Sequence, residues 1–306
     1  MLNYKTKEKK MNKYSEQISS NKAVVRIDVN SKDKRDFFVE DDTFLNYRLA
    51  DVKVSKEITK DKADIVWNVD ESTKSIDYVD GQVIVNGAWE EGELNKLMVS
   101  VLANEMDLNG LHPFHSSCVV YKGKTILLVG GENNHGKSMS QLEGCRRGGK
   151  IFSTETTVTD DNGMALYGST NVYIRKRAKG TERSDLPSQD EGVLKFWDKE
   201  PKMEYISGPL KIDLAIMPGI DGHFDTQVTP MGLFEKCYQS YHSLMNFFGL
   251  NQLLSGVGGC VQPILDTEER RQKRGKFIEK FCDPIPYYMI RAKTPQILFD
   301  EIEKLL

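Results

Sequence analysis

The sequence predicts an α/β protein, with some α+β character, in which a larger domain of alternating strands and helices follows a small β-rich domain. Short strand-like runs dominate the first third of the chain. A glycine-rich loop at residues 131–138 then stands between a strand-like run and a helix-like run, and both kinds of run continue to the end. The 306 residues allow two domains, and we expect a flexible basic tail at 1–22 and domains at 23–110 and 111–306.

Composition and charge are those of an ordinary soluble protein. Apolar residues make up 39% and charged residues 28%, and the net charge of −3 argues against nucleic acid as a partner. The five cysteines are odd in number and widely spaced, which favours reduced thiols and a cytoplasmic location. Residues 237–265 carry no charge, but polar residues and glycines interrupt them. We therefore expect a buried or interface helix there, with a homo-oligomer left open, and no membrane span.

The N-terminal domain is predicted to be a strand-rich module closed by a helix. Residues 1–22 are rich in lysine and read as a frayed polar terminus, with a docking arm for an acidic partner as the alternative. An amphipathic helix is expected at 92–106, because Leu94, Leu97 and Val101 recur on one side. The strands are expected, in order, at 23–29, 44–54, 63–69 and 75–85 with a turn at 80–81.

The second domain is expected to begin with two strands joined by a turn at 122–123, which lead directly into the glycine-rich loop. The helix after the loop, at 137–147, has an apolar stripe of Met139, Leu142 and Cys145. A polar loop is expected at 176–190. The other elements are a strand at 150–153, a hairpin of 156–159 and 164–167, strands at 171–175 and 211–217, a loop at 218–225, helices to about 254 and at 267–281, a strand at 287–292 and a helix at 295–306.

The loop reads G-E-N-N-H-G-K-S and fits the phosphate-binding pattern G-x-x-x-x-G-K-[ST]. A strand–loop–helix of this kind directs backbone N–H groups and the positive end of a helix dipole at one spot. Lys137 is expected to reach the outer phosphates and Ser138 to hold Mg²⁺; the alternative is a glycine-rich turn that binds nothing. The expected nucleotide-binding residues are Gly131, Glu132, Asn133, Asn134, His135, Gly136, Lys137, Ser138 and Met139.

Candidate partners of the phosphates lie on both sides of the loop. His115 precedes it, and Glu155 follows the next strand, where an acidic residue commonly supports Mg²⁺ or takes a proton. His223, after an apolar strand, is a candidate for acceptor binding, with an aspartate-stabilised turn as the alternative. Zinc on the x₂-spaced His112, His115 and Cys118 is disfavoured, because strand positions three apart face opposite sides. The cations expected to clamp phosphate or acceptor are Arg175, Arg177 and Lys179.

Residues 111–175 resemble the catalytic core of the HPr kinase family, which is related to the phosphoenolpyruvate carboxykinases. The run 285–306 also resembles the closing strand and helix of that family. The first 110 residues match only the general layout of stand-alone members, which carry a small domain there. The matching residues are His115 and Val119, Gly123 and Lys124, Leu127 and Leu128, Gly136, Lys137 and Ser138, Gly148, and residues 151–155.

The resemblance implies a P-loop kinase that uses ATP and Mg²⁺ to phosphorylate a hydroxyl: a serine side chain, free serine, a peptide or a small metabolite. It places the family's acidic pair at Thr154 and Glu155. A threonine cannot act as a base near neutral pH. Either Glu155 or His115, whose reference pKa is about 6.5, would therefore prepare the acceptor hydroxyl. Glu155 would also bind the metal together with Ser138. The alternative function is a nucleotide-binding regulatory module without phosphotransfer.

Overall fold

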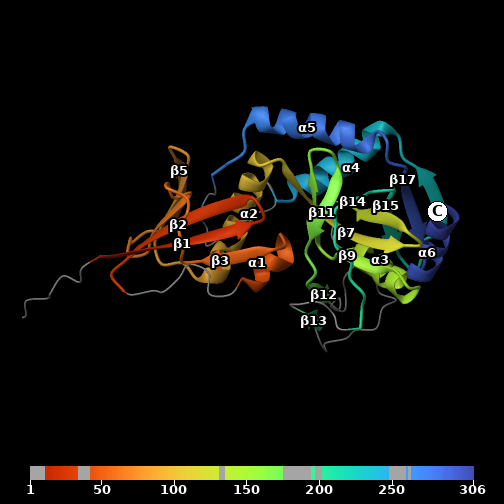
Figure 1. Cartoon of the computed structure of the whole chain (residues 1–306), viewed down its shortest axis with the longest axis horizontal. Helices are drawn as coiled ribbons and strands as arrows, with labels where there is room; N and C mark the ends of the chain where they lie inside the picture. Colours follow the sequence, from red (N-terminus) through yellow and green to blue (C-terminus); the bar gives the residue numbers. More distant parts are fainter. Residues whose placement is uncertain are drawn as a thin grey trace, which may run out of the picture.

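The computed structural model describes residues 11–33, 42–130, 135–174, 194–196, 202–247, 260 and 263–306. Six helices and two large mixed sheets lie within these ranges, so the predicted α/β class is confirmed at this coarse level (Figure 1). None of the helices in the described ranges has the length and apolar character needed to cross a bilayer.

The first sheet has six strands in the spatial order β3-β1-β2-β4-β6-β5. Helix α2 (Glu91–Leu108) packs on it with the predicted apolar side, and Leu94 and Leu97 are buried. The predicted frayed terminus is wrong for the residues of β1, because Ile18 is buried and pairs with Val25 of β2. Residues 1–10 lie outside the described ranges. The strands are β1 (Asn12–Ser20), β2 (Ala23–Ser31), β3 (Val52–Ser55), β4 (Ile65–Asn68), β5 (Ser75–Val79) and β6 (Gln82–Asn86).

The strand predicted at 44–54 is wrong, because helix α1 (Thr43–Arg48) occupies its first half and only β3 its end. Leu45 and Leu49 are both buried, but Tyr47 between them is only half-buried. On a strand all three would share one face, whereas on a helix Tyr47 lies on another side. The side chain of Asn46 then closes the reversal with two hydrogen bonds to Val52, donating to its carbonyl at 3.0 Å and accepting from its N–H at 2.8 Å. Tertiary burial and this turn outweigh the strand propensity of the segment.

The second sheet runs in the order β14-β11-β10-β7-β8-β15-β17-β16, and β9 pairs with β7 as a branch. Strands β8, β15 and β17 are parallel to one another, whereas β7 is antiparallel to β8. The hairpin of β10 and β11 and the strand at 287–292 are confirmed. The strands are β7 (Leu111–Tyr121), β8 (Lys124–Val129), β9 (Lys150–Ser153), β10 (Thr156–Asp160), β11 (Met164–Gly168), β14 (Leu210–Lys211), β15 (Leu214–Ile220), β16 (Gln227–Pro230) and β17 (Tyr287–Ala292).

Both faces of β8 are covered, as its unbroken apolar run predicts. Ile126 and Leu128 face a core that includes Phe299 of α6 (Pro295–Lys304), while Leu127 and Val129 face the core that includes Leu244 of α4 (Leu233–Met245). Helices α3 (Lys137–Arg146) and α6 therefore lie on one side of the sheet, and α4 and α5 (Glu268–Cys282) on the other. This burial holds the carboxyl end of β8, where the loop begins, in a fixed place.

The buried side of α3 is not the stripe predicted from the sequence. Met139 is 40% exposed, and the buried positions include Gln141 and Gly144. The Gln141 amide donates to the backbone oxygen of Cys118 at 2.9 Å and also reaches that of Ser153. A side chain on Gly144 would meet Phe299, 2.7 Å from an added Cβ. The helix is therefore held on the sheet by the close packing at Gly144 and by the hydrogen bonds of the Gln141 amide, and not by an apolar stripe.

The second strand of the parallel set also differs from its prediction. The expected strand at 211–217 is displaced to β15, and the first residues of the expected loop at 218–225 complete it, because pairing with β17 continues to Ile220 opposite Ala292. The strand at 171–175 is found as β12 (Val172–Ile174), which pairs with β13 (Leu194–Phe196). The predicted loop at 176–190 lies outside the described residues.

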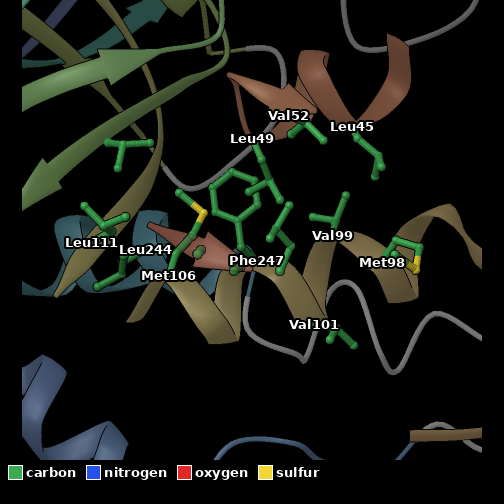
Figure 2. Close-up of a cluster of buried hydrophobic side chains, with 14 of the residues drawn as sticks. Leu45, Leu49, Val52, Met98, Val99, Val101, Met106, Leu111, Leu244 and Phe247 are labelled. Atoms are coloured by element: carbon green, nitrogen blue, oxygen red, sulfur yellow. The ribbon is translucent and has the colours of Figure 1, made fainter. Parts of the chain in front are cut away.

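Helix α5 lies across the junction between the two sheets (Figure 1). Its Arg274 is buried and donates to Asp107 at the end of α2, at 2.8 Å, and to Asp266. Residues from α1, β3, α2, β7 and α4 also share one buried apolar cluster at this junction (Figure 2). The N-terminal part is thus packed against the part that carries the glycine-rich loop by both apolar and ionic contacts.

Candidate active site

The glycine-rich loop leaves the sheet at the carboxyl end of β8, where ligands commonly bind in α/β sheets. Residues 131–134 lie outside the described ranges, and the chain is described again from His135. The backbone N–H of Ile220, at the end of β15, donates to the oxygen of His135 at 3.2 Å. The ends of two parallel strands therefore flank the beginning of α3.

Gly136 is required by its conformation and by its neighbour. Its φ is +106°, and a Cβ at this position would lie 2.7 Å from Cδ1 of Ile220. Directly after it, Lys137 is only 9% exposed, and its Nζ donates to the oxygen of Gly130 at 2.8 Å. The ammonium thus lies against the backbone that follows the carboxyl end of β8, while Ser138 and Met139 are exposed on the first turn of α3.

Neighbouring strands bring His115 and Glu155 to the same edge. Ser116 of β7 pairs with Val129, the last residue of β8, so His115 lies just past the end of that strand. His115 in turn pairs with Thr156 of β10, and the N–H of Ser116 donates to the oxygen of Glu155 at 3.1 Å. Two of the predicted catalytic residues therefore lie together, at the edge of the sheet from which the loop departs.

The carboxylate of Glu155 is held at one oxygen by two side chains. Nε2 of His115 lies 3.1 Å from Oε1, and Nη1 of Arg48 lies 2.7 Å from the same atom. Burial by itself raises the pKa of Glu155, but His115, Arg48 and Lys137 lower it more, so that this pKa falls to about 2. Glu155 is therefore ionised at any physiological pH and is a weak base.

His115 is 3% exposed and is neutral near pH 7, because burial lowers its pKa below 6.5 although Glu155 opposes the effect. An ionised carboxylate can only accept a hydrogen bond, so Nε2 carries the ring proton and donates a hydrogen bond to Glu155. Nδ1 is then the unprotonated nitrogen, and it has no hydrogen-bond partner among the described residues. The edge of Phe247 lies against the ring, with centroids 6.4 Å apart.

Protein-family models yield no match to this chain, and a search of curated proteins yields no significant match either.

The side chain of Thr154 is buried and hydrogen-bonded to the backbone. Its side-chain oxygen lies 2.6 Å from the backbone oxygen of Asn171 and 3.0 Å from that of Ser169, so its hydroxyl donates into the neighbouring backbone. The residue is 8% exposed. A carboxylate at this position would face carbonyl oxygens with no proton to donate. The second acid that the family resemblance leads one to expect is therefore excluded by the local backbone.

Changing Thr154 to aspartate is expected to destabilise the protein and not to raise any turnover above that of the wild type. The loss is about 1–3 kcal/mol or more, because a buried hydrogen bond is replaced by an unpaired charge. Thermal unfolding and turnover of Thr154→Asp check this, with Thr154→Ser as the control, since serine keeps the hydroxyl. Faster turnover in the aspartate variant than in the wild type would contradict it.

Other predicted residues are placed apart from this group or lie outside the described ranges. His223 is exposed on the turn after β15, where its N–H donates to Oδ1 of Asp221 at 3.0 Å, as in an aspartate-stabilised turn. His112 stacks on Phe277 and contacts Asp161 at 2.9 Å, away from the partners of His115. The candidates outside the described residues are Gly131, Glu132, Asn133, Asn134, Arg175, Arg177 and Lys179.

Sequence reasoning missed Arg48 and Asn246. Nη2 of Arg48 donates to Oδ1 of Asn246 at 2.8 Å, which links the site to the end of α4. Neither residue stands in a motif, and 107 positions separate Arg48 from Glu155. Only the packing of α1 against the second sheet brings them together, so no signal local to either segment marks them.

The low pKa of Glu155 predicts how stability depends on pH. Because its folded pKa of about 2 is below the reference 4.5, its contribution is fully present above 4.5 and is lost as the pH falls toward 2. Over this pH window the free energy of unfolding of the wild type should fall by on the order of 3 kcal/mol more than that of Glu155→Gln. Urea unfolding at several acidic pH values measures both free energies. Parallel curves for the two proteins would show that Glu155 is not held as described.

Proposed function

We propose that this chain is an ATP- and Mg²⁺-dependent phosphotransferase with an HPr-kinase-like domain, which transfers a γ-phosphoryl group to a hydroxyl. One observation carries the proposal: the phosphate-loop lysine and an ionised carboxylate bound to a neutral histidine converge at one edge of the sheet. The carboxyl end of β8 supplies the loop, and β7 and the turn before β10 supply His115 and Glu155.

The loop side of the site binds the donor. Lys137, now paired with the carbonyl of Gly130, exchanges that neutral acceptor for phosphate oxygens, which carry full charge. The first turn of α3 adds the positive end of the helix dipole, which favours a phosphate at that place. Phosphoryl transfer depends mainly on positioning and on charge stabilisation, and these groups supply both.

The residues present fit a magnesium ion. Hard cations prefer oxygen ligands, and oxygen donors are offered by the exposed Ser138 hydroxyl, next to the loop lysine in the chain, and by the ionised Glu155 carboxylate. When bound, the metal neutralises charge that develops on the phosphates. Ser138 and Glu155 are the residues that would hold it.

On the acceptor side, Glu155 orients the hydroxyl, and its low pKa makes it a poor proton acceptor before transfer. His115 keeps the carboxylate in place through Nε2. A loose transition state needs little removal of the proton in advance, so one carboxylate suffices without the acid that Thr154 replaces.

Transfer from γ-labelled ATP to a panel of acceptors tests the proposal. The panel contains free serine, serine peptides, sugars and nucleosides, each with and without Mg²⁺. Label is expected in one acceptor class, only with Mg²⁺. Tight binding of ATP without transfer to any acceptor would exclude a kinase of this kind.

A second function, a nucleotide-binding regulatory module without transfer, is favoured by the position of Thr154. Its hydroxyl is committed to backbone oxygens, so the site has a single carboxylate. The two functions differ in turnover. If the wild type binds ATP with the same affinity as Glu155→Gln and neither forms ADP, the regulatory function is the better account.

A further inference from the structure

Arg48 reaches into the site from the N-terminal part of the chain. It is the last residue of α1, and its side chain is 13% exposed. One nitrogen of the guanidinium lies 2.7 Å from Oε1 of Glu155, and the other donates to Asn246 at 2.8 Å. The group also lies over the ring of Phe247, 5.2 Å from its centroid. Two separate segments, the turn before β10 and the end of α4, therefore determine where this cation lies.

The backbone around Arg48 is fixed as well. The hydroxyl of Thr156, the first residue of β10, donates to the carbonyl oxygen of Arg48. The next residue, Leu49, is fully buried and belongs to the same apolar cluster as Phe247 (Figure 2). Because both the main chain and the side chain are held, the guanidinium has little freedom to turn away from Glu155.

The contacts to Glu155 are one-sided. Both Arg48 and His115 bind Oε1, and these are the ion pairs that the described residues make with this carboxylate. A carboxylate fixed through one oxygen by two donors has a fixed plane, and its second oxygen is left for another ligand. An apolar brace would hold α1 in place at a lower desolvation cost, but it would not orient a carboxylate.

We propose that Arg48 is a positioning residue of the phosphoryl-transfer site, which the N-terminal part of the chain supplies to the loop-bearing part. It holds Glu155 through Oε1 so that Oε2 faces metal and acceptor. This inference rests on the function proposed above. It also makes α1 a component of the site, although α1 contributes no group to the reacting atoms.

Replacing Arg48 with methionine, which keeps the length and removes the charge, tests the inference in the full chain. The turnover number should fall by about 10–100-fold, as is usual when a partner that orients a metal-binding carboxylate is lost. The KM for ATP should change little, because Lys137 and the loop bind the donor. Arg48→Lys should recover part of the turnover, since it keeps a charge but not the fork.

Arg147 offers a matched control. Its guanidinium lies 5.2 Å from the centroid of Phe299 and 3.0 Å from Glu143, so it has the same kind of surroundings on the outer side of α3. Arg147→Met should lower the melting temperature with turnover per folded molecule unchanged. If Arg48→Met behaves in the same way, Arg48 is only a brace and the inference is wrong.

Binding of Mn²⁺ in the presence of a non-hydrolysable ATP analogue separates this inference from the proposed function. Arg48→Met should lower the affinity for Mn²⁺ by about tenfold or more, and Arg147→Met should leave it unchanged. If the wild type transfers no phosphate but Arg48→Met still has a lower affinity for Mn²⁺, the proposed function fails and the positioning role stands. Equal Mn²⁺ affinity in the wild type and Arg48→Met overturns the positioning role.

Discussion

Lys137→Met is expected to lower kcat/KM for phosphoryl transfer by about 10²–10³-fold or more, the usual cost of removing one group that stabilises transition-state charge. The lysine is 9% exposed and its Nζ donates to the oxygen of Gly130, so a cation from solvent cannot easily take its place. Methionine keeps the length of the side chain. Steady-state kinetics, with ATP affinity measured by calorimetry, check both parts of the effect.

Lys124 provides the control for this experiment. It stands at the opposite end of β8, is 48% exposed in its side chain and pairs with Asp213 at 3.6 Å. An exposed pair of this kind contributes about 0–1 kcal/mol, so Lys124→Met should fold and turn over like the wild type. Equal kcat/KM in Lys137→Met and Lys124→Met would remove the loop lysine from the mechanism.

Glu155→Gln should lower turnover by about 10²–10⁴-fold while binding of ATP without metal stays unchanged. The amide keeps the shape of the side chain but cannot neutralise Arg48, which lies 2.7 Å away, nor act as an anionic metal ligand. Some loss of stability should accompany the change, because a largely buried cation loses its partner. Single-turnover kinetics separate the chemical step from ATP binding.

Glu143 is the matched control for Glu155. Its side chain is 7% exposed and pairs with Arg147 at 3.0 Å, but α3 carries it away from the loop. Glu143→Gln should therefore lose stability to a similar degree and keep its turnover. Comparable turnover in the two variants, once corrected for the folded fraction, would show that Glu155 acts only through stability.

The local frame of the site could be predicted from the sequence. The apolar run of β8, the loop pattern and the following helix lie next to one another in the chain, so periodicity and motif together suffice. His115 and Glu155 were expected near the loop, and strand pairing brings them together at 3.1 Å. The confirmed elements, β8 and the helix after the loop, are adjacent in the chain, whereas the pairing of β7 with β10 joins segments that lie far apart in the sequence.

Two features could not be predicted, for physical reasons. Helix α1 lies in a segment with strand-like composition, and only the burial of Leu45 and Leu49 with residues far along the chain makes the helix favourable. Arg48 enters the site as a consequence of that helix. The polar packing of α3 on the sheet was also missed. It depends on hydrogen bonds from Gln141 to backbone oxygens of two strands, and hydrophobic periodicity cannot predict such tertiary contacts.

The fate of the γ-phosphate tests the central claim most directly. ³¹P NMR of the wild type with MgATP and the acceptor panel follows ADP, inorganic phosphate and any new phosphate ester in one sample. We expect ester to form in step with ADP, and neither to form with Lys137→Met. ATP that stays intact while bound, or ADP matched only by inorganic phosphate at a rate shared with Lys137→Met, would contradict a phosphotransferase at this site.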